Sequence, residues 1–282
     1  MIYYLIASIL IAVAALFART KRAVLAAGIL FYAVQIAAAG LLLWGGLYDT
    51  TSAAFFTFDA LGTLFYLLLV VVSMYVFGHS EAYLQGEDLR SYRLYFALLM
   101  LLTTAIAGAY FANNLAVTWI FLEATTLCSA GIIYHRRTAQ ALEAAWKYVF
   151  VCSTGIAMAY LGILLLAAAT KCETLSYEAV TEAASSGNPL YLKTAFLLIL
   201  SGYSCKLELF PLYTVGIDAN FAAPAPASAL ISTGLVNAGF LALLLFTLVV
   251  ALMSLFLPGR DDEMLRNNPA LYLDVQSWFM LG

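Results

Sequence analysis

Long apolar runs alternate with short polar or charged stretches along most of the chain. Eight runs are close to or longer than the roughly 20 residues that a helix needs to cross the hydrocarbon core of a bilayer. They cover residues 2–18, 23–45, 59–78, 94–111, 114–134, 141–168, 190–213 and 226–256. This pattern predicts an all-α, polytopic membrane protein with about eight transmembrane helices. The last run would be roughly 46 Å long as one helix, so it must tilt, protrude or consist of two pieces.

The composition fits a membrane protein and excludes several other classes. Of the 282 residues, 64% are apolar and 10% are charged, and the mean hydropathy is +0.94. Soluble domains are about 45–50% apolar and about 25% charged, so this chain has too few charged groups to cover a water-facing globule of its size. We therefore exclude a secreted disulfide scaffold, a nucleic-acid-binding protein and a disordered chain, and we expect lipid to surround it.

The basic residues favour one orientation in the membrane. Seven of the thirteen fall in the polar stretches after the first, third and fifth apolar runs, whereas the intervening stretches carry mainly acidic residues. The seven are Arg19, Lys21, Arg22, Arg90, Arg93, Arg136 and Arg137. Because positively charged loops stay on the cytoplasmic side, the N terminus is predicted to lie outside. His135 falls at the edge of one such loop, where a surface position is expected.

Ionisable residues inside the apolar runs are the first candidates for function, since a charge near the bilayer centre is costly. Glu123 lies in the middle of the run 114–134. It is either a structural pin that is hydrogen-bonded to a neighbouring helix or a group that carries protons. Burial and nearby charges tune the pKa of a carboxyl group, so a buried glutamate can exchange protons near neutral pH.

A lysine in the sixth run is the second candidate. Lys147 lies about two turns into the run 141–168, and Glu143 precedes it by four residues on the same helical face. One interpretation is that Lys147 snorkels to the inner membrane surface beside Arg136 and Arg137. The other is that it faces the interior of the bundle, where a lysine can bind and release a proton.

Lys206 is the strongest single signal. It lies deep in the run 190–213, five residues before Pro211, which cannot donate a hydrogen bond to Leu207 and should break or kink the helix. Freed backbone groups are tolerated in a membrane only where they line a cavity or pack within protein, so a lysine beside a broken helix favours a transport role. Glu208 is a secondary candidate that points to a different face, and whether it has a partner stays open.

Smaller polar residues within the runs suggest a wet path between these charges, although most such side chains in membrane helices bond their own backbone or a neighbour. They are Thr125, Thr126, Ser153, Thr154, Ser201, Ser204, Ser228, Ser232, Thr233 and Asn237. Ser232 and Asn237 are secondary candidates, as is Asp218. The segment from Asp218 to Pro226 is predicted to form a re-entrant loop. The sequence shows no metal-ligand cluster, phosphate loop, dinucleotide-binding motif or iron–sulfur spacing, so no redox chemistry is expected in this chain.

Two long segments carry a resemblance to a known family. Residues 119–155 include the motifs E-A-T-T-L and L-E-A-A-W-K-Y, and residues 202–239 include C-K-L-E-L-F-P and A-P-A-P-A-S-A-L. Together they resemble the antiporter-like proton-channel subunits of respiratory complex I and its relatives, most of all component F of hydrogenase-4-type complexes. The motif F-D-A-L-G at residues 58–62 also fits, and the resemblance covers about residues 55–250.

The resemblance implies a fold in which three leading helices precede two inverted five-helix repeats, each with a broken helix. Residues 1–78 would hold the leading helices, and residues 94–256 would hold the first repeat, with its broken helix at 190–217. Residues 257–282 would form a charged, amphipathic tail that ends like the start of a further apolar segment. Only the first repeat is therefore expected here.

The resemblance also implies roles for single residues. In this family a glutamate and a broken-helix lysine form the ion pair whose opening and closing is thought to gate proton movement. Glu123 and Lys206 match these two positions, and Lys147 matches a lysine that many members carry in the intervening helix. The chain departs from the family where V-G-I-D-A-N at residues 215–220 replaces the usual W-L-P-D-A-H, and where Ser232 replaces a histidine that complex I relatives often carry.

The leading hypothesis is a proton- or sodium-translocating subunit of a hydrogenase-4-like multisubunit oxidoreductase in the plasma membrane of a prokaryote. Glu123, Lys147 and Lys206 would form a half-channel. The chain would hold no cofactor, since iron–sulfur clusters, a nickel–iron centre or a quinone would belong to partner membrane subunits and soluble redox subunits. Two alternatives stay open: a non-conducting membrane scaffold and a component of a multisubunit sodium/proton antiporter. Continuity of polar side chains from Lys206 to both surfaces separates conduction from scaffolding.

Overall fold

The computed structural model describes residues 1–45, 55–171, 174–184, 189–209 and 212–256, and regular secondary structure in these residues is helical. The longer helices are α1 (Ile2–Leu16), α2 (Lys21–Leu43), α3 (Ala60–Tyr83), α4 (Leu89–Tyr110), α5 (Leu115–Ile133), α6 (Ala139–Thr170), α8 (Pro189–Ser204) and α11 (Val236–Phe256). The shorter ones are α7 (Tyr177–Ala184), α9 (Tyr213–Ala222) and α10 (Ala225–Leu230). A 3-10 turn, η2 (Tyr134–Arg136), follows α5, and a π-helical turn, η3 (Ile231–Leu235), joins α10 to α11. The predicted all-α fold is confirmed.

Six helices in the described part of the chain are long and apolar enough to cross a membrane. They are α2, α3, α4, α5 with its 3-10 turn, α6, and the continuous helix Ala225–Leu245 that begins with α10. Two further apolar helices, α1 and α8, are shorter. The polytopic membrane character is therefore confirmed, whereas the predicted count of eight crossings is not.

Polar residues between the apolar runs fix where several helices begin. The Thr20 hydroxyl and the Asp59 carboxylate each accept a hydrogen bond from a backbone N–H in the first turn of the next helix, at 3.2 and 3.1 Å. Asn114 and Thr138 cap α5 and α6 in the same way. A side-chain oxygen at this position satisfies an N–H that has no partner within the helix. The caps thus set helix starts that apolar periodicity alone leaves open by a few residues.

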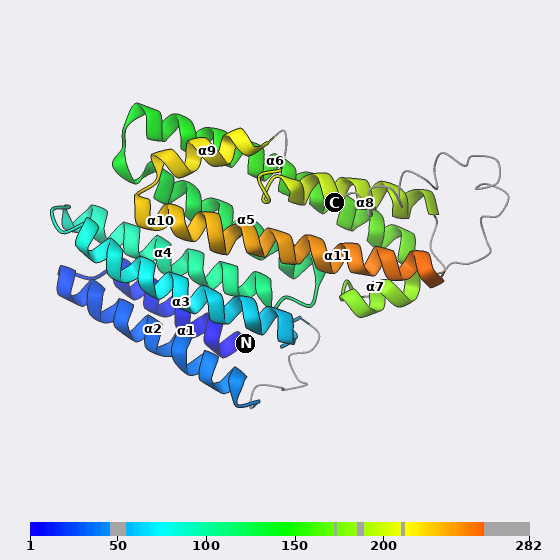
Figure 1. Ribbon diagram of the computed structural model, residues 1–282, viewed down its shortest axis with the longest axis horizontal. Coiled ribbons are helices and arrows are strands. Elements are labelled where there is room, and N and C mark those ends of the chain that lie inside the picture. Colours follow the sequence, from blue (N-terminus) through cyan, green and yellow to red (C-terminus); the bar gives the residue numbers. More distant parts are fainter. Residues whose placement is uncertain (46–54, 172–173, 185–188, 210–211, 257–282) are drawn as a thin grey trace.

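The helices lie side by side with their long axes roughly aligned (Figure 1). α1, α2, α3 and α4 form one side of the molecule, α6, α8 and α9 form the opposite side, and α5 and α11 lie between them. The most extensive pairings are α6 with α8, α4 with α5, and α5 with α6. This arrangement puts α5, which carries Glu123, between the two sides.

Glycines allow α6 and α8 to approach closely. A Cβ atom added at Gly202 would lie 2.5 Å from the carbonyl oxygen of Gly155, and one added at Gly162 would lie 2.8 Å from that of Ala195. No side chain larger than hydrogen fits at these distances. Small residues let the backbones of membrane helices pack together, so this contact holds the first half of the broken helix against α6.

The broken helix is interrupted between Ser204, where α8 ends, and Tyr213, where α9 begins. Pro211, the residue predicted to break the helix, lies outside the described residues. The second half is longer than the expected limit at residue 217, because α9 continues to Ala222.

The predicted re-entrant loop at residues 218–226 is wrong, since only Ala223 and Pro224 separate α9 from α10. Proline restricts the residue before it to extended backbone but places no such limit further upstream. Ala223 accordingly has ψ 153°, while the preceding residues stay helical. Pro226 falls in the first turn of α10, where its missing N–H costs no hydrogen bond.

Candidate functional site

Lys206 lies in the break between α8 and α9 and is almost fully buried, with 1% of its surface exposed. Its Nζ donates a hydrogen bond to Oγ1 of Thr126 on α5 at 2.6 Å. The ring centroid of Tyr148 on α6 lies 5.6 Å from Nζ, within range of a cation–π attraction. A Cβ added at Gly239 on α11 would lie 3.0 Å from the Cβ of Lys206. The lysine is therefore enclosed by α5, α6 and α11.

Thr126 connects Lys206 to Glu123. Its Oγ1 lies 3.5 Å from Oε2 of Glu123, and the Ser153 hydroxyl on α6 donates to Oε1 of the same carboxylate at 2.8 Å. Glu123 and Thr126 are three residues apart, a spacing that places two side chains on one helical face. We call these four residues, Lys206, Thr126, Glu123 and Ser153, the central network, and it links the broken helix to α5 and α6.

The lysine and the glutamate of the central network do not form a direct ion pair. Both ion pairs found among the described residues involve Lys147 instead. A threonine hydroxyl stands between the two groups that the resemblance pairs directly. A hydroxyl can accept through two lone pairs but has one hydrogen to donate. Thr126 can thus accept from the ammonium of Lys206 while donating either to Glu123 or to the carbonyl of Leu122, which is 3.2 Å away.

Two further hydroxyls lie beside the central network. Those of Tyr148 and Ser129 are buried and lie close to each other, without a hydrogen bond of ordinary length in the part of the chain that the structure describes. The two side chains are neighbours where α5 meets α6. A buried hydroxyl without a partner is costly, and a bound water satisfies such groups where two to four polar partners converge. This corner, next to Lys206, therefore has the groups that an ordered water needs.

Lys147 is not part of the central network. Its Nζ pairs with Glu143 at 2.7 Å and with Asp218 on α9 at 3.3 Å. About half of the Lys147 side chain and about half of the Asp218 side chain are exposed. The pairing of Lys147 with Glu143 is as predicted, and of the two interpretations of Lys147 the half-exposed position agrees with the one that places it away from the bundle interior. The face of α6 that meets α8 carries Tyr148 and Gly155, seven residues apart, and Lys147 lies about 100° around the helix from Tyr148.

Glu208 follows Lys206 by two residues but packs elsewhere. Its φ is +51°, a left-handed backbone conformation that residues other than glycine rarely adopt. The carboxylate lies against α9, where a Cβ added at Gly216 would be 2.2 Å from Oε2. Glycine at 216 is therefore required for this close approach, and Glu208 is placed against the second half of the broken helix.

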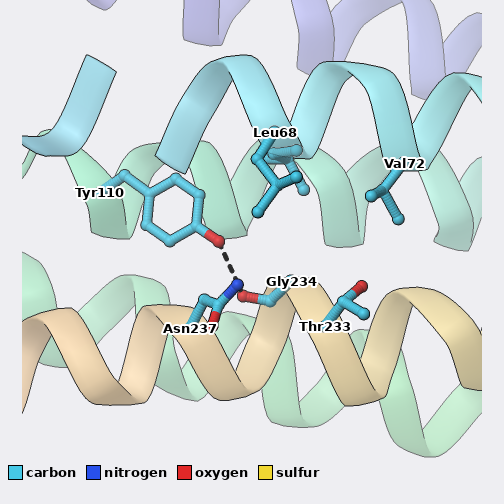
Figure 2. A pocket seen from close by; sticks show the side chains of 7 residues that line it. Leu68, Val72, Tyr110, Thr233, Gly234 and Asn237 are labelled. Atoms are coloured by element: carbon cyan, nitrogen blue, oxygen red, sulfur yellow. Dashed lines mark hydrogen bonds between the residues drawn. The ribbon is translucent and has the colours of Figure 1, made fainter. Parts of the chain in front are cut away.

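The two secondary candidates of the last helix also lie outside the central network. Ser232 is exposed, and its hydroxyl donates to the carbonyl of Ser228 in its own helix at 2.9 Å. Asn237 lines a small cavity of about 10 Å³ between α3, α4 and the π-helical turn η3 (Figure 2). There the Tyr110 hydroxyl donates to the carbonyl of Gly234 at 2.9 Å. Of the predicted relay, the structure brings together Glu123 and Lys206 only.

Sequence reasoning missed Ser129 and Tyr148. A signal for Tyr148 was present, because it shares a helical face with Gly155 and Gly162 at seven-residue intervals. Glycines repeated in this way mark a close helix–helix contact. A tyrosine on the same helical face is therefore expected to be buried. Lys147, one residue earlier, lies on a different face and is expected to be more exposed.

The sequence matches one family over about half of its length. Residues 112–257 match the family described as NADH:quinone oxidoreductase/Mrp antiporter, TM. Over 210 residues the chain is 31% identical to a hydrogenase-4 component F homolog from Methylacidiphilum infernorum, covering 70% of this chain and 44% of that protein. Over 184 residues it is 32% identical to the Na(+)/H(+) antiporter subunit A1 of Staphylococcus aureus, covering 64% of this chain and 22% of that protein.

The fold is shared with chains of three membrane complexes. The TM-score is 0.73 with the membrane-bound sulfane sulfur reductase, an archaeal respiratory complex, at 22% identity over 85% of this chain and 50% of that one. It is 0.71 with the Mrp complex from Dietzia, at 21% identity over 86% and 27%. It is 0.67 with respiratory complex I from Thermus thermophilus, at 22% identity over 86% and 52%. The chain thus spans about half or less of the length of these relatives.

Proposed function

The chain belongs to the NADH:quinone oxidoreductase/Mrp antiporter transmembrane family, and from this membership we propose that it translocates protons through Lys206, Thr126 and Glu123. It acts as one membrane subunit of a multisubunit oxidoreductase of the hydrogenase-4 type, with its N terminus outside a prokaryotic plasma membrane. The relative named hydrogenase-4 component F supports this assignment. Iron–sulfur clusters, a nickel–iron centre or a quinone belong to partner subunits in this proposal.

The observation that carries the proposal is the burial of Lys206 within reach of a carboxylate through one hydroxyl. A charge inside a membrane protein costs several kcal/mol unless it is paired, so such residues are retained for function by default. Lys206 lacks a direct ion pair among the described residues, so structural pairing does not account for it. A group that exchanges its proton with Glu123 does account for it.

The proton transfer follows from the hydrogen bonds of Thr126. Its O–H first turns from the carbonyl of Leu122 toward Oε2 of Glu123, and the 3.5 Å separation shortens. The ammonium of Lys206 then gives a proton to Oγ1 of Thr126 as that hydroxyl passes its own proton to the carboxylate. The products are a neutral amine, an unchanged threonine and a neutral carboxylic acid. Both charges disappear in one step, so no isolated charge is left in the low-dielectric interior.

Lys147 stands at the edge of the proposed half-channel. Lys147, Glu143 and Asp218 form a half-exposed ionic cluster on the outside of α6 and α9. Such a cluster is unfavourable against lipid, so we expect adjoining protein to cover it in the assembled complex. In that position it passes protons between the central network and the neighbouring segment or subunit.

The experiment compares proton pumping and redox turnover in inverted membrane vesicles that contain the assembled complex. We expect Lys206→Ala and Glu123→Gln to abolish pumping while electron transfer by the partner subunits stays measurable. Lys193→Ala is the matched control, because this lysine is exposed on α8 of the same broken helix. Pumping that is unchanged in both relay variants would refute the relay and favour a non-conducting scaffold.

A component of a sodium/proton antiporter is the second candidate function, and the 32% identity to the Staphylococcus aureus antiporter subunit favours it. The two candidates differ in what drives ion movement. An antiporter moves protons when a sodium gradient is imposed on vesicles without any electron donor. A redox-driven subunit moves protons only when an electron donor is supplied, and a sodium gradient does not change its rate of proton movement.

A further inference from the structure

A cavity with a volume of about 300 Å³ lies at one end of α4 and α5. This volume is at the lower end of the range for small-molecule sites, roughly 300–1,000 Å³. None of the residues of the central network line it. Its walls come from the first turns of α4 and from the end of α5 with the turn that follows, and they include Ser91, Leu94, Leu98, Gly131, His135 and Arg137.

The outer part of this cavity carries polar groups without protein partners. Arg137 follows the turn η2 and makes no ion pair within the described residues, whereas the neighbouring Arg136 donates to the hydroxyl of Tyr83. Nε2 of His135 is buried and has no hydrogen-bond partner in the same described ranges, and its ring packs edge-on against Tyr95 at 5.1 Å. His135 is partly exposed at the edge of the loop, as expected, although this ring nitrogen is covered. The guanidinium of Arg137, which has no ion-pair partner among the described residues, and the side chain of His135 line one cavity.

The inner part of the cavity is apolar. Leu94 and Leu98 form the α4 wall. At its deep end the helices touch, since a Cβ added at Gly131 would lie 2.7 Å from Cδ1 of Leu98. From Ser91 to Leu98 the helix rises roughly 10 Å, so the cavity passes from a charged mouth to an apolar floor within that depth. A phospholipid changes from phosphate to acyl chain over a comparable depth.

We propose that this cavity binds the phosphate headgroup and the first part of an acyl chain of an anionic phospholipid. The charged groups that act on His135 at this mouth are Glu87, Arg136 and Arg137, so positive charge exceeds negative charge around the histidine. Arginine binds phosphate oxygens through two parallel hydrogen bonds, and basic pockets between membrane helices on the cytoplasmic side are typical of anionic lipid sites. This site does not depend on the proposed proton relay.

The test measures lipid retention by native mass spectrometry on the chain purified with the subunits that accompany it. The protein is exchanged into nanodiscs of phosphatidylcholine that contain increasing fractions of phosphatidylglycerol. We expect wild type to retain phosphatidylglycerol in preference to phosphatidylcholine. Arg137→Gln should weaken this retention about tenfold, the effect of losing a hydrogen bond between two charged groups, whereas loss of general surface charge alone should have a smaller effect. Leu94→Trp, which fills the cavity and keeps the charge, should weaken it to a similar extent.

Arg22→Gln is the matched control, because it removes one positive charge from an exposed position on the same predicted side of the membrane, at the start of α2. Equal losses in Arg137→Gln and Arg22→Gln would show that general surface charge, not this cavity, holds the lipid, and would overturn the proposal. Displacement of the lipid by millimolar inorganic phosphate would overturn the commitment to a lipid in favour of a free anion. Loss of an acidic partner protein from the Arg137→Gln variant, with lipid retention at the wild-type level, would also overturn the proposal in favour of a protein ligand.

Discussion

Replacing Thr126 by valine tests most directly the threonine bridge, the Thr126 hydroxyl that links Lys206 to Glu123. Valine keeps the branched shape of the side chain and removes the hydroxyl that accepts a hydrogen bond from Lys206 at 2.6 Å and faces Glu123 at 3.5 Å. The neighbouring Thr125 offers a matched control. It is also fully buried, but its hydroxyl donates to the carbonyl of Leu122 at 2.6 Å, within its own helix. Both hydroxyls can reach the carbonyl of Leu122, but only that of Thr126 also contacts Lys206 and Glu123, so the two variants differ in that contact alone.

The magnitude follows from the charge on Lys206. A hydrogen bond to a charged group is worth about 1.5–3 kcal/mol, and Thr126 supplies the one hydrogen bond that the Lys206 ammonium makes within the described residues. If the transition state for proton transfer loses that stabilisation, the rate falls about 10- to 150-fold. Thr125→Val loses only a bond within α5, so its pumping rate should stay within about twofold of wild type.

The assay is proton uptake into inverted vesicles, measured by quenching of a pH-sensitive dye and divided by the rate of electron transfer in the same vesicles. Thr126→Ser keeps a hydroxyl and should restore most of the ratio. Equal pumping ratios in Thr126→Val and Thr125→Val would show that protons do not pass through Thr126. A ratio that falls in Thr126→Val and is not restored by serine would point to a packing defect instead.

Three further predictions concern the surroundings of this bridge. Ser153→Ala removes a hydrogen-bond donor to the Glu123 carboxylate at 2.8 Å and should lower the pumping ratio about 10-fold. Thr154→Ala loses only a hydrogen bond within its own helix and should leave the pumping ratio unchanged. Equal pumping ratios in the two variants would contradict a role for Ser153. Gly202→Ala should destabilise the purified protein by about 1–3 kcal/mol through overpacking, which would be measured as a lower thermal midpoint. Gly40 has open space around it, so Gly40→Ala should leave the stability equal or higher. Tyr148→Phe keeps the ring beside Lys206 and removes the hydroxyl that faces Ser129. A water bound between the two hydroxyls would lose a partner, so stability should fall by about 1 kcal/mol. Unchanged or higher stability would show that no water is held there.

The helices could be predicted from the sequence because the bilayer imposes their length. Every backbone polar group in the hydrocarbon core needs a partner within the segment, so a long apolar run has few alternatives to a helix. The run at residues 23–45, for example, corresponds to α2 at Lys21–Leu43. The end of α9 could not be predicted in this way. It depends on where Pro224 interrupts the backbone, and not on hydrophobicity, which continues across the interruption.

The candidate residues were predictable as residue types but not as contacts. A charge in an apolar run identifies Glu123, Lys147 and Lys206 from the sequence alone, because such charges are costly there. Which of them meet depends on the rotation of α6 about its axis. That rotation is set by the contact of α6 with α8, and it turns Tyr148 inward and leaves Lys147 half-exposed.

The threonine bridge changes the energetics that a direct ion pair would have. Adding the two distances of 2.6 and 3.5 Å gives an upper limit of about 6 Å between Nζ of Lys206 and Oε2 of Glu123. Coulomb attraction falls inversely with distance, so it is weaker than in an ion pair at about 3 Å and no less than roughly half of it. A strong direct pair would hold both groups in their charged forms and oppose proton transfer. A pair weakened by the bridge, with a hydroxyl that conducts the proton, brings the charged and neutral states closer in free energy, and a relay that must pass through both states in every cycle requires this.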